Sequence, residues 1–158
     1  MKSHKTTWFL VSVFLLIIGF GWWQTSVSSK VDSLQVNGEK VVVYKSPLCG
    51  CCVKYVSYLE KNGFDVEVKS TKDMNSVKEK YGVPVNMESC HTMIVDDYVV
   101  EGHIPVEVVD QLLKDRPDIS GIALPDMPAG SPGMPGRKIE PFKIYSLTAT
   151  GTEVFGLY

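Results

Sequence analysis

Apolar and polar positions alternate along this chain with two different periods, which predicts helices and strands in turn. The run Val41–Tyr44 is β-branched and aromatic and ends at Ser46-Pro47, which predicts a buried strand. From Cys52 to Asn62 the apolar residues recur at helical spacing, and Asn62-Gly63 is a typical helix end. This part of the chain is therefore expected to form a strand, a cysteine-containing loop and a helix.

Downstream segments continue the alternation through a strand, a short polar helix, a hairpin and a last helix: 64–68, 71–81, 92–101 and 105–114. The hairpin is predicted to turn at Asp96-Asp97. A helical connection between two strands normally makes them parallel, with a right-handed crossover. The expected fold is therefore an α/β, thioredoxin-like domain with the element order βαβαββα.

The chain changes character beyond Arg116-Pro117. Glycine, proline and methionine dominate up to Gly136, so we expect a loop here and no regular ladder or helix. Two later runs, Phe142–Leu147 and Glu153–Tyr158, predict a hairpin that adds to an edge of the sheet. The expected organisation is an N-terminal segment, a thioredoxin-like domain and a Pro/Gly/Met-rich extension with a hairpin packed on that domain: 1–30, 31–118 and 119–158.

The N-terminus carries an uncharged run from Trp8 to Trp23, preceded by Lys2 and Lys5. Basic residues ahead of such a run keep that end inside the cell. The run matches either a signal peptide or a short membrane-spanning helix, and the lack of a clear Ala-x-Ala cleavage signal favours an uncleaved anchor. In both cases we expect the domain to lie outside the cytoplasm, in the periplasm, secreted or tethered to the membrane.

Size and charge narrow the classes of function. The chain has 158 residues and a formal net charge of −2. It lacks the broad positive field that nucleic-acid binding usually needs, so we expect no nucleic-acid partner. Without its first segment and its tail, the chain has room for one domain of about 100 residues.

Three of the four cysteines fall within four positions, at Cys49, Cys51 and Cys52. This spacing disfavours two structural disulfides, because neighbouring cysteines cannot easily close an unstrained bridge. Cys49 lies where a strand passes into a helix, and free backbone N–H groups there favour a thiolate. The Cys49 and Cys52 pair also forms the C-x-x-C pattern of thioredoxin-like redox sites. The cluster is therefore expected to be reactive or to bind a metal.

The fourth cysteine, Cys90, is followed by His91 and precedes the predicted hairpin. In the expected topology this segment lies beside the cysteine loop, where thioredoxin-like proteins usually place a cis-proline. Thiolates and an imidazole that converge from two loops suit Cu(I), and the predicted metal ligands are Cys49, Cys51, Cys52, Cys90 and His91. Zinc is less favoured, because only one half of a two-knuckle pattern is present.

Three further residues are secondary candidates as metal ligands. His103 precedes the last predicted helix, and an exposed histidine is the favoured interpretation there. Met127 and Met134 lie in the Pro/Gly-rich segment without helical spacing. They are candidate thioether ligands, although simple loop methionines are the favoured interpretation.

Four segments together carry a recognisable pattern: Val43–Cys52, Ser89–Thr92, Val100–Pro105 and Met127–Met134. The chain closely resembles the CopG-type family of periplasmic copper-resistance proteins, a group long catalogued as a domain of unknown function. The resemblance implies a thioredoxin-like fold, a cysteine-held copper site, and a role in handling, oxidising or reducing copper in the cell envelope. The family's motif cysteines correspond to Cys49, Cys51, Cys52 and Cys90, with His91 beside them.

Several functions stay open at this level. The leading hypothesis is a copper-resistance protein that stores Cu(I) or passes it on, with copper ions and other envelope copper-handling proteins as partners. The same site could transfer electrons, because thiolate and imidazole ligands support both copper oxidation states. The alternative is a thiol-disulfide oxidoreductase that uses Cys49 and Cys52. A third hypothesis is an interaction module stapled by its cysteines, and the sequence does not decide whether the protein is an enzyme.

Overall fold

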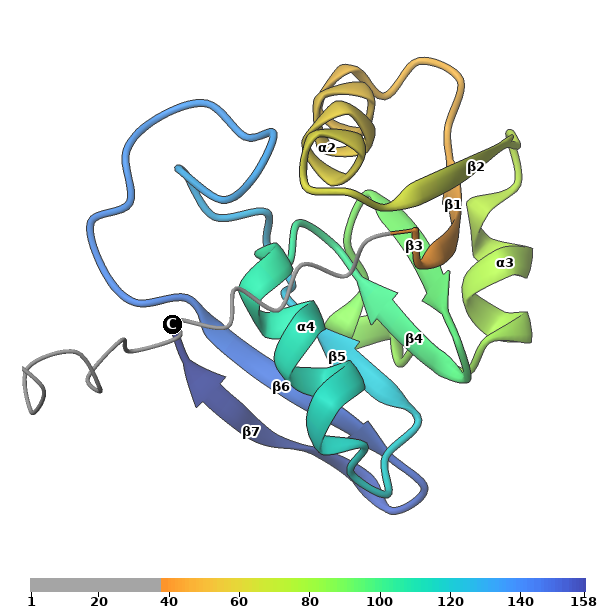
Figure 1. Ribbon diagram of the computed structural model, residues 1–158. Coiled ribbons are helices and arrows are strands. Elements are labelled where there is room, and N and C mark those ends of the chain that lie inside the picture. Colours follow the sequence, from red (N-terminus) through yellow and green to blue (C-terminus); the bar gives the residue numbers. More distant parts are fainter. Residues whose placement is uncertain (1–37) are drawn as a thin grey trace, which may run out of the picture. The chain divides into compact units, whose positions relative to one another are not determined.

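One seven-stranded sheet, in the order β2-β1-β3-β4-β5-β6-β7, organises residues 38–158, the part of the chain that the computed structural model describes (Figure 1). Its helices and strands, in chain order, are β1 (Lys40–Lys45), α2 (Gly50–Lys61), β2 (Asp65–Ser70), α3 (Met74–Lys80), the 3-10 helix η2 (Val85–Met87), β3 (His91–Val95), β4 (Tyr98–Glu101), α4 (Val106–Asp115), β5 (Gly121–Ala123), β6 (Lys143–Thr148) and β7 (Gly151–Leu157). The predicted order βαβαββα is confirmed. It covers β1 to α4.

The predicted anchor or signal peptide at 1–30 lies outside the described residues. Within 38–158, no helix is both long enough and apolar enough to cross a membrane. The predicted boundary between 31–118 and 119–158 stays a prediction.

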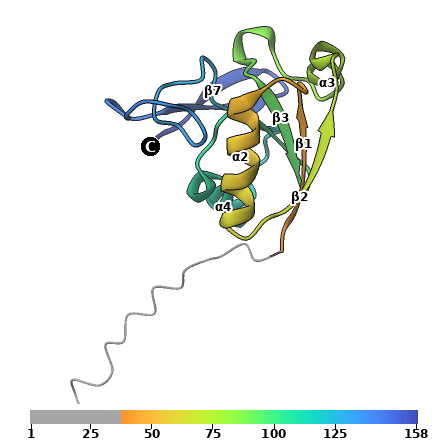
Figure 2. The same cartoon turned by 90° about the horizontal axis from the view of Figure 1, so that it is seen from above.

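The sheet has a buried apolar cluster on each face. Neighbouring residues of a strand point to opposite faces, so Val100 packs with α2 and α4, whereas Val99 packs on the other side with Val83 and Met87. Figure 2 shows α2 and α4 together, with α3 apart from them. The first face holds the larger cluster, which includes the fully buried Tyr55.

The strands pair as the predicted order of helices and strands requires. β1 runs parallel to β2 and antiparallel to β3, and β3 and β4 form the predicted hairpin around Asp96-Asp97. The C-terminal hairpin of β6 and β7 is also confirmed.

The expectation that the segment after Arg116-Pro117 forms no ladder was wrong at one place. β5 pairs parallel with β4 and antiparallel with β6, so it joins the C-terminal hairpin to the sheet. Gly121 permits this pairing, because a Cβ atom there would overlap the backbone of Val99. Ile122 then contributes a fully buried side chain.

The loop between β5 and β6 reaches back to the first turn of α2 (Figure 1). A Cβ atom at Gly133 would lie 2.9 Å from the carbonyl oxygen of Cys51 and 2.9 Å from the backbone nitrogen of Tyr55. A side chain would not fit without a shift, so glycine allows this close approach. The Pro/Gly/Met-rich segment is thus brought against the cysteine loop.

Candidate metal centre

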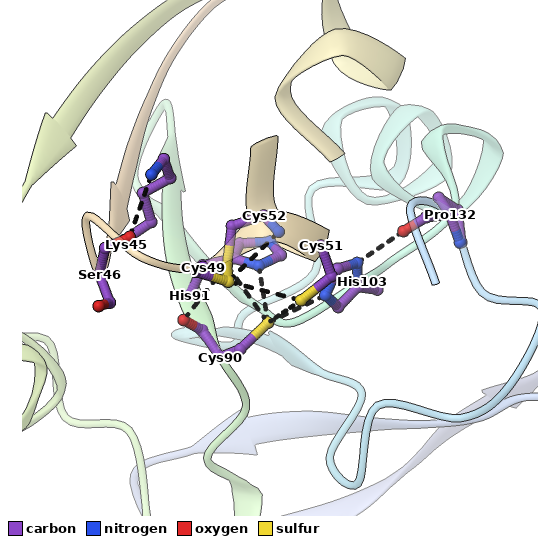
Figure 3. The surroundings of a disulfide bond; sticks show 9 residues. All are labelled: Lys45, Ser46, Cys49, Cys51, Cys52, Cys90, His91, His103 and Pro132. Carbon is purple, nitrogen blue, oxygen red and sulfur yellow. Dashed lines mark hydrogen bonds between the residues drawn. A yellow bond between two sulfur atoms is a disulfide. The ribbon is translucent and has the colours of Figure 1, made fainter. Parts of the chain in front are cut away.

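The cysteine loop leads into α2, and Cys49 is the N-cap residue of this helix. The Cys49 Sγ accepts a hydrogen bond from the backbone N–H of Cys52 at 3.3 Å, and the Cys49 N–H donates to the Ser46 carbonyl at 3.1 Å. These bonds place three cysteines at the positive end of the helix dipole, where thiolates are stabilised. Cys49 and Cys52 form a disulfide with their Cα atoms 5.3 Å apart (Figure 3).

Cys51 and Cys90 are free thiols, and both lie against this disulfide. The Cys51 Sγ is 3.4 Å from that of Cys49 and 3.7 Å from that of Cys90. The Cys90 Sγ is 3.5 Å from that of Cys52. All four sulfur atoms therefore lie within 4.8 Å of one another, although Cys90 is distant from the others in sequence.

The position of Cys90 follows from the sheet register. Lys45, the last residue of β1, pairs with His91, the first residue of β3. The loops that follow β1 and precede β3 therefore lie side by side, as the sequence predicted. The Sγ of Cys52 also lies 3.6 Å from the backbone carbonyl oxygen of Cys90.

His91 lies beneath the sulfur atoms and is fully buried. Its Nδ1 is 3.5 Å from the Cys90 Sγ, and its ring packs on Tyr55 with the centroids 4.5 Å apart. Burial, together with the nearby His103 and Lys78, holds the pKa of His91 well below its usual value. The ring is therefore neutral, and its buried Nε2 has no hydrogen-bond partner among residues 38–158.

His103 is fully buried at the same site, so the favoured expectation of an exposed histidine was wrong. Its Nε2 lies 2.9 Å from the Cys90 Sγ, and its Nδ1 lies 2.6 Å from the Pro132 carbonyl (Figure 3). A carbonyl only accepts, so Nδ1 carries the proton and Nε2 presents its lone pair to Cys90. Burial lowers the pKa of His103, which favours this neutral form.

The Cys90 thiol holds its proton strongly. Burial and the neighbouring Cys51 raise the pKa of the Cys90 thiol to about 12. Its S–H can therefore donate to the Nε2 of His103. A cation that bound the Cys90 sulfur would displace this proton, because only the thiolate is a metal ligand.

The two methionines differ in their surroundings. Met127 is exposed, and the predicted role of Met127 and Met134 as ligands stays a prediction. Met134 is half-buried and directly follows Gly133, whose backbone lies against Cys51. Of the two, Met134 belongs to the stretch of chain that reaches the cysteine loop.

The donor set suits a soft cation. Two groups of potential ligands meet at Cys90: the four cysteines, and Cys90 with His91 and His103. Neutral imidazole nitrogens and thiolates are the ligands that copper and zinc prefer in proteins. The two neutral imidazoles fit such a cation, because the Nδ1 of His91 and the Nε2 of His103 lie 3.5 and 2.9 Å from the Cys90 Sγ.

Fold and site together define a thioredoxin-like protein in which a cysteine cluster and two buried histidines occupy the redox position of the fold. Two solved structures, both described as copper resistance protein CopG, match the chain at 39% identity. Form 2 gives a TM-score of 0.71, covering 77% of this chain and 99% of that one; form 1 gives 0.70, covering 77% and 98%. The chain belongs to the CopG family of copper resistance proteins.

The chain was also compared with protein-family models and with curated proteins. Residues 87–134, which include Cys90, His91 and His103, match a family described as proteins of unknown function, DUF411. No curated protein matches the chain.

Proposed function

We propose that this protein binds Cu(I) outside the cytoplasm as part of copper resistance, through Cys49, Cys51, Cys52 and Cys90. His91 and His103 supply neutral nitrogen donors beside Cys90. The proposal rests on the approach of four sulfur atoms to within 4.8 Å of one another, since Cu(I) accepts thiolate and imidazole ligands at low coordination numbers.

The oxidation state of the cysteines controls this binding. In the disulfide form only Cys51 and Cys90 are free thiols. Opening the Cys49–Cys52 disulfide takes two electrons and two protons from an external dithiol, which is itself oxidised to a disulfide. The reduced protein then offers four sulfur ligands, and we expect it to hold more Cu(I) than the disulfide form.

Copper titration tests the proposal. Full-length protein is reduced, freed of reductant without oxygen, and titrated separately with Cu(I) and Zn(II), while free thiols are counted at each step. We expect bound Cu(I) to protect all four thiols. Cys49→Ser should lower the copper stoichiometry while the protein stays folded, and Ser57→Ala on α2 is the matched control. An unchanged copper stoichiometry in Cys49→Ser would remove this cysteine from the site.

The observed disulfide favours a second candidate, a thiol-disulfide oxidoreductase. Cys49 caps α2 and accepts the Cys52 N–H, which is a favourable setting for an attacking thiolate. Cys51 and Cys90 count against this function, because they lie close enough to compete as resolving thiols. Rapid dithiol-dependent reduction of a protein disulfide, together with no retained copper, would favour the oxidoreductase.

The location outside the cytoplasm rests on the Lys2, Lys5 and Trp8–Trp23 pattern. A reporter enzyme that is active only outside the cytoplasm, fused behind Tyr158, tests it. We expect activity from the full-length fusion and none after removal of residues 2–23. Equal activity of the two fusions would contradict the proposed location.

A further inference from the structure

A buried ion pair lies beside the segment that carries Cys90 and His91. Lys78 of α3 and Glu101, the last residue of β4, are 4% and 0% exposed, and their charged groups are in contact. Apolar side chains in place of a buried pair are often equally stable, so stability alone does not account for these two charges.

The Glu101 carboxylate bonds to the residues on both sides of Cys90-His91. Its Oε1 accepts the backbone N–H of Ser89 at 2.6 Å, and its Oε2 accepts the Thr92 hydroxyl at 2.6 Å. Hydrogen bonds to an ionised group are about twice as strong as neutral ones. One side chain therefore holds the chain immediately before Cys90 and immediately after His91.

The two residues that follow β4 connect this carboxylate to the other histidine. Gly102 donates its N–H to the His91 carbonyl at 3.1 Å, and a Cβ atom at Gly102 would lie 2.7 Å from the Ser89 Oγ. His103 follows directly. The contacts of Glu101 and Gly102 thus set the spacing of Cys90 from His103.

Among residues 38–158, no cis-proline holds the backbone before β3, the place where thioredoxin-like proteins usually have one. Pro84 lies upstream, at the start of η2, and no peptide bond within 38–158 is cis. The backbone before β3 is restrained by a side chain from the neighbouring strand instead. Thr92 and Glu101 pair across the hairpin, so the restraint comes from within the sheet.

We propose that Lys78 and Glu101 are positioning residues that hold Cys90 and His91 in ligand geometry, an inference that rests on the copper-binding function proposed above. Glu101 makes the bonds to Ser89 and Thr92, and Lys78 is the counter-charge in contact with its buried carboxyl group. Neither residue is among the proposed copper ligands.

Two double variants of the full-length chain test this role. Lys78→Met with Glu101→Gln removes both charges but leaves a side-chain oxygen for the Ser89 N–H. Lys78→Met with Glu101→Leu removes the charges and the acceptor together. Val41→Ala, in the buried part of β1 that pairs with Val95, is the control for loss of stability. Readouts are Cu(I) affinity by chelator competition and the alkylation rate of Cys90 relative to Cys51 in the disulfide form.

The Leu variant should lose Cu(I) affinity by about 10- to 100-fold, the usual cost of removing a group that orients a metal ligand. Its Cys90 should be alkylated faster than in the native chain, whereas the Gln variant and Val41→Ala should keep both values close to native. Native affinity and alkylation in the folded Leu variant, or equal losses in the Gln and Leu variants, would overturn the proposal. If the native chain retains no copper, the proposed function fails, and the alkylation rates still decide the positioning role.

Discussion

The β3–β4 hairpin carries an ion pair at each end, and the two pairs differ in their surroundings. At the turn, Arg116 pairs with Asp96 in solvent, where the two side chains are 52% and 38% exposed. At the open end, Lys78 pairs with Glu101 in the interior, and the same carboxylate also binds Ser89 and Thr92. Exposed pairs contribute little to stability, whereas an interior charge depends strongly on its partner.

The same contrast extends to the rest of the hairpin. The open end holds Cys90, His91 and His103, all in contact with one another, and the turn holds acidic residues that face solvent. Buried polar groups of the hairpin are thus concentrated at the end where the proposed ligands lie. Changes at the open end should therefore cost both stability and metal affinity, while changes at the turn should cost neither.

The largest effect is expected from Lys78→Met. It leaves the Glu101 carboxylate buried without its cation, and breaking one side of a buried pair typically costs about 3–5 kcal/mol. Urea unfolding measures this loss. Adding Glu101→Gln should recover most of it, and failure of the second change to do so would show that Lys78 acts through other contacts.

A somewhat smaller loss is expected from Gly102→Ala. Gly102 has a φ of 83°, and a Cβ atom there would lie 2.5 Å from the Leu124 carbonyl oxygen. Backbone strain and overpacking together should lower the free energy of unfolding by about 2–3 kcal/mol. Gly38→Ala is the matched control, since it has a similar φ but open space around it. If both variants lost the same free energy of unfolding, the positive φ would explain the loss and the close contacts of Gly102 would add nothing.

Acid should weaken the metal-free protein through its two buried histidines. Their pKa values are lowered in the folded state, so below their ordinary pKa of about 6.5 the unfolded chain binds protons that the folded chain excludes. The stability from these groups is present above this pH and is lost as the pH falls towards the folded pKa values. Between pH 7.5 and 5.5 the loss should be about 1–3 kcal/mol.

Urea unfolding at the two pH values measures this effect. The double variant His91→Gln with His103→Gln should show a clearly smaller change between pH 7.5 and 5.5. The same pH dependence in the variant would assign it to carboxyl groups elsewhere in the chain.

The smallest effect is expected at the turn. Arg116→Met removes an exposed pair, so the denaturation midpoint and the Cu(I) affinity should both stay close to native. A copper affinity that fell as far as in Lys78→Met with Glu101→Leu would remove the distinction between the two ends of the hairpin.

Sequence reasoning located the βαβαββα elements and brought Cys90 beside the cysteine loop, because topology alone places those loops together. It missed β5, because a three-residue strand that starts with Gly121 has too short a pattern to separate from a loop. Local sequence also does not reveal that Lys78 is buried, since its partner Glu101 lies in a different element.

The register of the predicted hairpin indicates where His103 lies. A two-residue turn at Asp96-Asp97 pairs Val95 with Tyr98 and, further along, Thr92 with Glu101. Continuing this register by two residues places Cys90 opposite His103. The hairpin was predicted correctly, so its register already indicated that this histidine lies at the cysteine site.

In the proposed site, sulfur atoms from both loops hold Cu(I) together. X-ray absorption spectroscopy at the copper edge, on reduced protein loaded with Cu(I), observes the ligands directly. We expect a Cu(I) edge with sulfur as the main neighbour, and fewer sulfur neighbours in Cys90→Ser. A spectrum dominated by nitrogen and oxygen, or one that Cys90→Ser leaves unchanged, would contradict it.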